Sequence, residues 1–340
     1  MWSFSIPKKD GYYYLLTAEG GTGYGHAVTM ARAESIKGPY ILDPGNPMLT
    51  SRNDRSLPIQ KAGHADIVEM QNGEWYLVHL CGRPLPGSDH CILGRETCLQ
   101  KVYWNEDGWL RIQPDGNKPK EIVADSGLME CKWPVPEHMD HFDSNELRIE
   151  YQSLRIPLTK SVASLTERPG YLRLKGKESL SSPYQQSLIA RRQQAFCYTA
   201  DTCVEFNPES HKHLAGLVCY YSTRNYHYLY ISRNKIGKCL GIITCNNGKS
   251  SFSPKEEISI DGIDRVYLRV EVDFSSLKFY YSTDGDTWKH VGDELDASIL
   301  SDENCKSSYG FTGAFVGLCC QDMLYGEKYA DFDYFMYLER

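Results

Sequence analysis

The chain has 340 residues, a length that predicts two domains rather than one compact core. Hydrophobic residues make up 41% and charged residues 24%, which is ordinary for a folded globular protein and argues against long disordered or fibrous segments. The net charge is −7 and no block of Lys or Arg stands out, so we expect no nucleic-acid partner. No apolar stretch reaches the length of a membrane-spanning helix, and the first residues do not resemble a secretory signal, so we expect a cytoplasmic protein without a membrane partner.

Aromatic residues and cysteines are both frequent in this sequence. The aromatic share of 12%, together with 28 glycines, favours strands, tight turns and stacking surfaces that suit sugars or bases. The twelve cysteines include no Cys-x-x-Cys pair and no His partner at finger spacing, which argues against a structural zinc site. We expect reduced core thiols that act as small hydrophobic residues.

The first third of the chain alternates aromatic and aliphatic runs with tight turn signals. Asp-Gly or Asn-Gly pairs at 10–11, 72–73 and 107–108 each predict a type I′ hairpin. Antiparallel sheets in series are typical of β-propeller blades, but residues 1–113 hold only about two blades, and a propeller needs several to close its ring.

The segment between Asp115 and Glu137 is rich in Pro, Gly, Lys and Asp, which predicts a domain boundary. We place a first domain at 1–125 and a second at 126–340. In the second, short strands alternate polar and apolar residues, and no helical periodicity of useful length occurs. This pattern predicts an all-β chain that ends in a jelly-roll β-sandwich.

A glycine-dense loop at residues 18–26 carries Glu19 and Thr22. Glycines let backbone approach a ligand closely, and the loop lacks the Lys-Ser/Thr ending of a phosphate-binding loop. The alternative is a long turn with a solvated Glu19.

Three further residues offer binding chemistry. His64, at a strand start, is a candidate for orienting a carboxylate in a pocket, or else a buried histidine with satisfied hydrogen bonds. Arg83 and Arg95 each follow a glycine, and their planar forks match carboxylates or sugar hydroxyls, although a surface salt bridge is the alternative for each.

Several of these motifs resemble glycoside hydrolase family 43, in the branch of β-xylosidases and α-L-arabinofuranosidases that carry a C-terminal β-sandwich. The resemblance runs from about residue 10 to the end of the chain. In the first domain it rests on GYYYLLTAEGGTGYGHAVTMAR at 11–32, QKAGHAD at 60–66, EWYLVHLCGRPL at 74–85 and LGRETCLQKV at 93–102. In the second it rests on RPGYLRL at 168–174, FTGAFVGL at 311–318 and YADFDYF at 329–335.

The resemblance implies a five-bladed β-propeller, here represented by its C-terminal part, followed by a concanavalin A-like jelly-roll sandwich. It implies inverting, exo-acting hydrolysis of xylo-oligosaccharides or arabinosides. A carboxylate base activates water, a Glu protonates the leaving oxygen and an Asp tunes the pKa of that Glu. Two of these carboxylates would precede Met1 and the register of the acid falls at about Trp2, so we expect no catalytic carboxylate here and little activity from the chain alone.

The alternative function is a non-catalytic carbohydrate-binding or accessory protein that retains the sandwich. We expect as partners a xylo-oligosaccharide or arabinoside, together with a homo-oligomer or a missing N-terminal half.

The resemblance also assigns substrate-binding roles. His64 would lie beside the base, Arg95 would contact the tuning Asp and the sugar, and Thr22 would line the pocket. Phe315 would close the sugar site from the second domain by stacking on a pentose, and its alternative role is a core aromatic of its own strand.

We expect that this reaction requires no cofactor. Asp140 or Asp143, near the start of the sandwich, and Asp331 in its last strand would share a structural calcium ion, because hard oxygen ligands meet where first and last strands meet.

Overall fold

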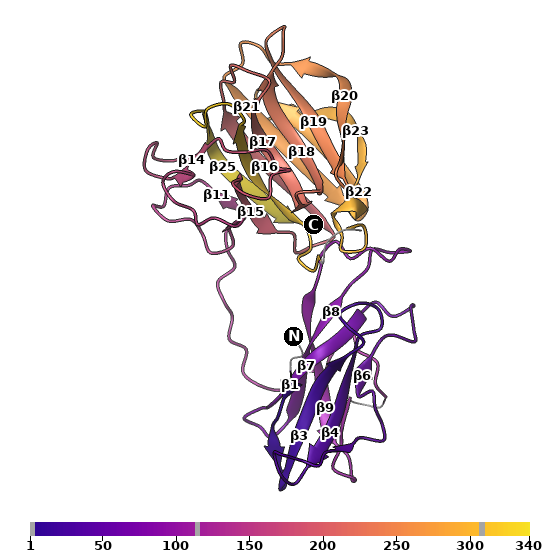
Figure 1. Ribbon diagram of the computed structural model, residues 1–340. Coiled ribbons are helices and arrows are strands. Elements are labelled where there is room, and N and C mark those ends of the chain that lie inside the picture. The colour runs from indigo at the N-terminus through magenta and orange to yellow at the C-terminus, as the bar shows by residue number, and fades with distance from the viewer. Residues whose placement is uncertain (1–3, 113–115, 306–309) are drawn as a thin grey trace. The chain divides into compact units, whose positions relative to one another are not determined.

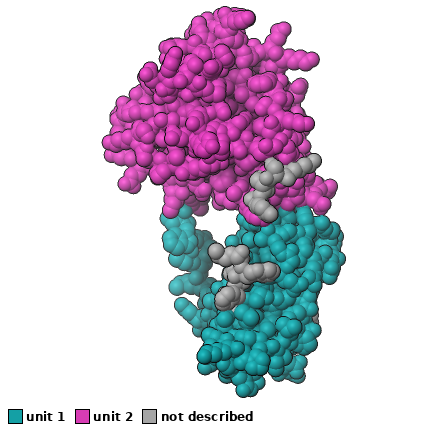
Figure 2. Space-filling view, in the orientation of Figure 1, with its two compact units in different colours: residues 1–84, 94–134 teal, residues 85–93, 135–340 magenta. Residues whose placement is uncertain are grey.

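The computed structural model describes residues 4–112, 116–305 and 310–340, which fold mostly as β-strands (Figure 1). The chain forms two compact units (Figure 2). Unit 1 comprises Met1–Pro84 and Gly94–Pro134, and unit 2 comprises Leu85–Leu93 and Val135–Arg340. The all-β prediction is confirmed. The division falls after Pro134 rather than after residue 125, and it gives a short internal segment of the expected first domain to unit 2.

Unit 1 contains two antiparallel sheets. The first has the order β1-β3-β4-β5, with β2 on β3 and β6 on β4. The second is a four-stranded meander in the order β10-β9-β8-β7, as in a propeller blade. The strands are β1 (Phe4–Ser5), β2 (Lys8–Lys9), β3 (Tyr12–Glu19), β4 (Ala27–Ala33), β5 (Ile41–Leu42), β6 (Leu49–Thr50), β7 (Gln60–Glu69), β8 (Trp75–Gly82), β9 (Glu96–Trp104) and β10 (Leu110–Ile112).

The three predicted hairpins of unit 1 all form, but with two kinds of turn. Asp10 and Gly11 both have positive φ and join Lys9 directly to Tyr12, as a type I′ turn requires. At 72–73 and 107–108 only the glycine has positive φ, and the hydrogen bonds enclose three loop residues. The type I′ prediction is therefore wrong at these two turns, because one more residue leaves the ladder and the glycine takes the left-handed position of a bulge.

Unit 2 is a sandwich of an eight-stranded and a seven-stranded sheet. The first has the order β13-β14-β25-β16-β21-β22-β23 with β11 on β25, and the second has the order β12-β15-β24-β17-β18-β19-β20. The strands of the first sheet are β11 (Met139–Asp140), β13 (Ala163–Ser164), β14 (Leu172–Lys175), β16 (Cys197–Glu205), β21 (Arg265–Asp273), β22 (Ser276–Ser282), β23 (Lys289–Asp296) and β25 (Tyr329–Glu339). Those of the second are β12 (Gln152–Ser153), β15 (Ser187–Arg192), β17 (His213–Ser222), β18 (Asn225–Arg233), β19 (Lys238–Asn246), β20 (Lys249–Ser259) and β24 (Phe315–Asp322). A turn of 3-10 helix, η1 (Ala297–Leu300), follows β23.

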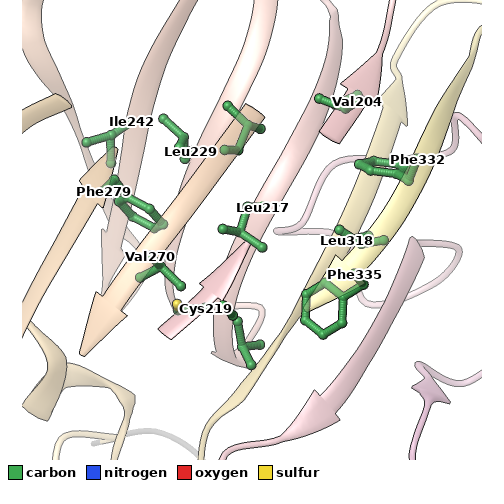
Figure 3. Packing of buried hydrophobic residues seen from close by; sticks show 14 of the residues in the cluster. Val204, Leu217, Cys219, Leu229, Ile242, Val270, Phe279, Leu318, Phe332 and Phe335 are labelled. Carbon is green, nitrogen blue, oxygen red and sulfur yellow. The ribbon is translucent and has the colours of Figure 1, made fainter. Parts of the chain in front are cut away.

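The core of the sandwich is filled by alternate residues from both sheets (Figure 3). Val270 and Phe279 from one sheet and Leu217 and Leu229 from the other are all fully buried. Burying such side chains stabilises the fold by about 1.5–3 kcal/mol each. Unit 1 has a separate core that includes Leu16, Met30, Leu77 and Trp109.

The segment Leu85–Leu93 connects β8 to β9 and belongs to unit 2. The backbone N–H of Ala314 donates to the carbonyl of Ile92 at 2.8 Å, and the Arg192 guanidinium donates to the carbonyl of Leu93 at 2.8 Å. Its apolar side chains form a small cluster with Phe196. The chain therefore passes between the two units three times rather than once.

The cysteines act mainly as packing residues. All twelve lie within the described ranges, and nine of them are buried. Within the same ranges, no helix is long and apolar enough to cross a membrane.

Candidate functional site

The candidate site of unit 1 starts from the glycine loop between β3 and β4. Gly20 has φ of +73°, and a Cβ at this position would lie 2.0 Å from the carbonyl oxygen of Gly25. The loop folds tightly back on itself because Gly20 carries no side chain. The role of this loop in binding a ligand stays a prediction. Glu19, at the end of β3, is not solvated alone but accepts a 3.1 Å bond from Arg52.

His26 follows this loop and is buried, with 1% of its surface exposed. Its ring packs against Gly63 of β7, where a Cβ would lie 2.2 Å from the ring. Burial lowers the pKa of His26 to about 4, although the hydrogen bond that the ring donates to the Lys61 backbone raises it. The neighbouring charges of His64 and Arg95 lower that pKa further. His26 is thus a neutral imidazole at neutral pH.

His64 lies beside His26 on an irregular part of β7. The pairing of β7 with β8 shifts register on both sides of Gly63, and His64 has φ of +54°. Bulges and left-handed non-glycine residues concentrate next to functional sites, where they re-aim a side chain. The His64 side chain is exposed, so its alternative as a buried structural histidine is wrong, and His26 is the buried one.

The two candidate arginines take different partners. Arg95 donates from Nη2 to the backbone carbonyl of Thr22 at 2.6 Å, which joins the start of β9 to the glycine loop. Arg83 instead makes a two-pronged ion pair with Glu96, with bonds of 2.7 and 3.0 Å. The structure therefore brings Thr22, His64 and Arg95 together, while Arg83 takes the salt bridge.

Phe315 is the first residue of β24 and is described within unit 2. It is half-buried and packs against a cluster on the outer side of the seven-stranded sheet that includes Tyr220 and Tyr226. The Arg192 guanidinium lies 5.7 Å from the Phe315 ring. The role of Phe315 in closing a sugar pocket stays a prediction.

The carboxylates expected to hold calcium have arginine partners instead. Asp331 accepts bonds from Arg173 at 2.7 and 2.8 Å and from Arg168 at 3.0 Å. Asp140 lies 3.4 Å from Arg148 and accepts the N–H of Phe142. Among the residues that the structure describes, no group of three or more His, Cys, Asp or Glu is placed to hold a metal ion. Guanidinium groups supply the positive charge expected from calcium, so these contacts lend calcium no support.

Two features of this region escaped the sequence reasoning. One is the burial of His26, whose imidazole the sequence places only at the end of the glycine loop. The other is a close thiol pair on neighbouring strands, Cys81 and Cys98, with sulfur atoms 3.0 Å apart. Nothing in the spacing of these cysteines signals the pair, because strand register sets it. The expected register of the acid, about Trp2, lies outside the described residues.

Comparison with known proteins agrees with this architecture. A model of glycosyl hydrolases family 43 matches residues 5–110, and a model described as the beta xylosidase C-terminal concanavalin A-like domain matches residues 139–338. The fold is that of a glycoside hydrolase in which β-propeller blades precede a concanavalin A-like sandwich. More particularly, the chain belongs to glycoside hydrolase family 43.

Individual relatives cover nearly the whole chain. A β-xylosidase of Bacillus subtilis is 42% identical over 97% of this chain and 63% of its own length. A non-reducing end α-L-arabinofuranosidase of Bacteroides ovatus is 34% identical over 95% of this chain and 60% of its own. The crystal structure of xylan β-1,4-xylosidase from Bacillus halodurans superimposes with a TM-score of 0.96 at 47% identity, over 99% of this chain and 64% of that one. The chain thus spans somewhat less than two thirds of these relatives.

Proposed function

We propose that this chain supplies part of the sugar pocket and the sandwich of a glycoside hydrolase that releases a terminal pentose, xylose or arabinofuranose, from oligosaccharides. The observation that carries the proposal is the similarity over nearly the whole chain to proteins named β-xylosidase and α-L-arabinofuranosidase.

The geometry of unit 1 supports a binding role for its cluster. The Arg95 guanidinium offers a planar set of donors to a carboxylate or to sugar hydroxyls. Its bond to the Thr22 carbonyl fixes the direction of the guanidinium. His26 stays neutral beside it and therefore adds no positive charge of its own.

We further propose that hydrolysis requires carboxylates beyond those of this chain. Inverting hydrolysis needs an acid and a base about 6.5–9.5 Å apart on either side of the glycosidic bond. The resemblance to family 43 leads us to expect these carboxylates outside this sequence, and the chain spans somewhat less than two thirds of its relatives.

The test measures turnover of nitrophenyl β-xyloside and nitrophenyl α-L-arabinofuranoside. Purified residues 1–340 are expected to hydrolyse both far more slowly than the Bacillus subtilis relative. Co-expression with the part of that relative that this chain does not cover is expected to give activity. The substrate turned over then separates xyloside from arabinoside. Turnover by the chain alone at the rate of the relative would overturn the need for added carboxylates.

A pair of arginine variants tests the site. In the co-expressed enzyme, Arg95→Ala is expected to lower kcat/KM by about 10²–10³-fold, the usual effect of removing a charged donor near the reacting centre. Arg83→Ala is the matched control, since Arg83 is engaged with Glu96, and is expected to change kcat/KM less than tenfold. Equal effects of the two variants on kcat/KM would contradict the assignment of Arg95 to the sugar-binding site.

A further inference from the structure

The sandwich carries a polar cavity of its own, separate from the candidate site of unit 1. Its volume is about 460 Å³, within the range of about 300–1,000 Å³ of small-molecule sites. It lies where the segment before β14, the end of β16 and the start of β25 meet. The lining residues used below are Arg168, Glu205, Asp264, Lys328, Tyr329 and Asp331.

Ion pairs between lining side chains order the polar surface of this cavity. Arg168 bonds to Glu205 through both terminal nitrogens, at 2.7 and 3.1 Å, and to Asp331 at 3.0 Å. Arg173 holds Asp331 from the other side at 2.7 Å. The Arg168 and Glu205 side chains are still 33% and 28% exposed. A ligand therefore meets donors and acceptors that are already ordered, which lowers the entropy cost of binding.

Charges of both signs line the cavity. Arg168 and Lys328 supply two positive charges to the lining, and Glu205, Asp264 and Asp331 supply three negative charges. Arg173 pairs with Asp331 from outside the lining. Adjacent donors and acceptors match hydroxyl groups, because each hydroxyl donates one hydrogen bond and accepts others.

Tyr329 adds an aromatic surface at the edge of the cavity. Tyr329 is 46% exposed, so its ring is open to a ligand. The Arg173 guanidinium lies 3.8 Å from its ring centroid and supports the ring. A supported, exposed ring beside fixed polar groups matches a sugar, which presents C–H groups on one face and hydroxyls at its edge.

We propose that this cavity is a second carbohydrate-binding site, which holds one neutral sugar unit of a xylo-oligosaccharide. The sugar ring stacks on Tyr329, and its hydroxyls donate to Glu205 and accept from Arg168. The choice of xylo-oligosaccharide rests on the proposed function, whereas the class of neutral sugar rests on the cavity alone.

The first test is calorimetric titration of residues 1–340 with xylotetraose. Tyr329→Ala is expected to weaken binding at the sandwich about tenfold, since the sugar loses the aromatic face on which it stacks. Tyr329→Phe retains the ring and is expected to bind like the parent chain. Tyr325→Ala is the matched control, because Tyr325 is 81% exposed in the neighbouring loop and lies outside the cavity lining. Unchanged affinity in Tyr329→Ala, or absence of any saturable binding, would overturn the inference.

A second titration separates this inference from the proposed function. In the Arg95→Ala chain, the binding that depends on Tyr329 is expected to persist. If the co-expressed enzyme fails to hydrolyse pentosides while this binding persists, the proposed function falls and the sandwich site stands. If Arg95→Ala abolishes all xylotetraose binding, the sandwich site falls and the proposed function is unaffected.

Discussion

Asp322 controls the turn that joins β24 to β25. Its Oδ1 accepts the backbone N–H groups of Leu324 and Tyr325, and its Oδ2 accepts those of Glu327 and Lys328, at distances of 2.8–3.1 Å. Burial alone would raise the pKa of this carboxyl, but the four amide hydrogen bonds outweigh it and lower the pKa to about 2.

Asp322→Asn is expected to destabilise the sandwich by about 2–3 kcal/mol at pH 7. The amide has one oxygen, so two backbone N–H groups lose their acceptor and face an NH₂ donor instead. Urea unfolding followed by circular dichroism measures the loss. Asp286→Asn, at an exposed turn position, is the control and is expected to stay within about 0.5 kcal/mol. A loss no larger than the control would contradict the role of the four bonds.

Acid is expected to destabilise both units well above the pH at which Asp322 titrates. Burial lowers the pKa of His26 in unit 1 and of His227 in unit 2 from 6.5 to about 4. As pH falls below 6.5 the unfolded chain takes up these protons first, so stability is full above that pH and declines toward pH 4. At pH 5 each histidine is expected to cost about 2 kcal/mol.

Unfolding transitions at pH 7 and pH 5 check this dependence on pH. His227→Gln removes one titrating ring and is expected to make the transition of unit 2 less sensitive to pH. The same slope in His227→Gln and in the parent chain would show that other groups carry the effect.

For individual residues, the sequence predicted which residues lie at the candidate site better than it predicted what their side chains contact. It placed Thr22, His64 and Arg95 at one site, and the structure brings them together in unit 1. It could not predict that His64 is exposed and His26 buried, because that choice depends on the bulged register of β7 against β8. The sequence also did not predict the partners of Asp331, because Arg168 and Arg173 are more than 150 positions away along the chain.

Among the elements, the loop between β3 and β4 offers a matched pair of glycines. Gly20 has positive φ and no room for a Cβ, whereas Gly23 has no positive φ and nothing within 4 Å of its Cβ position. Gly20→Ala is expected to destabilise unit 1 by more than about 2 kcal/mol, because left-handed backbone costs an alanine about 1–2 kcal/mol and the clash with Gly25 adds to this.

Tryptophan fluorescence is a suitable measurement, since Trp75, Trp104 and Trp109 all lie in or against the core of unit 1. Gly23→Ala is expected to leave the transition within about 0.5 kcal/mol of the parent chain. A similar small effect of both substitutions would mean that the loop rearranges around Gly20.

The strands themselves were largely readable from sequence, because their alternation matches one buried and one exposed face. The type of turn in each hairpin was predicted less well. An Asn-Gly or Asp-Gly pair signals a hairpin, but whether two or three residues leave the ladder depends on how the strands pair. The pair at 10–11 and the pair at 72–73 share a signal and form different turns.

For the whole molecule, the division into two units predicts what happens when a protease cleaves the chain at one position between them. The segment from residue 127 to residue 137 contains no strand, and Trp133 is 85% exposed. Limited trypsin treatment is therefore expected to cleave after Lys132, whose side chain is 80% exposed. The two pieces are expected to stay together, because Leu85–Leu93 remains part of unit 2.

Size-exclusion chromatography of the cleaved protein checks this expectation. Both pieces are expected in one peak under native conditions and in two peaks in urea. Two peaks without urea would show that the contacts of Leu85–Leu93 do not hold the pieces together. The sequence did not predict this behaviour, because the segment reads as an ordinary strand connection and its partners lie in the other half of the chain.

The same segment has a consequence for the order of events during synthesis. His90 bonds to Ser301 and the N–H of Cys91 bonds to Glu303, across more than 200 intervening positions. When Leu85–Leu93 leaves the ribosome, these partners, more than 200 positions further along the chain, have not been translated. Until they are made, the apolar side chains of this segment have no partners, so the nascent chain carries an aggregation hazard that the folded protein does not.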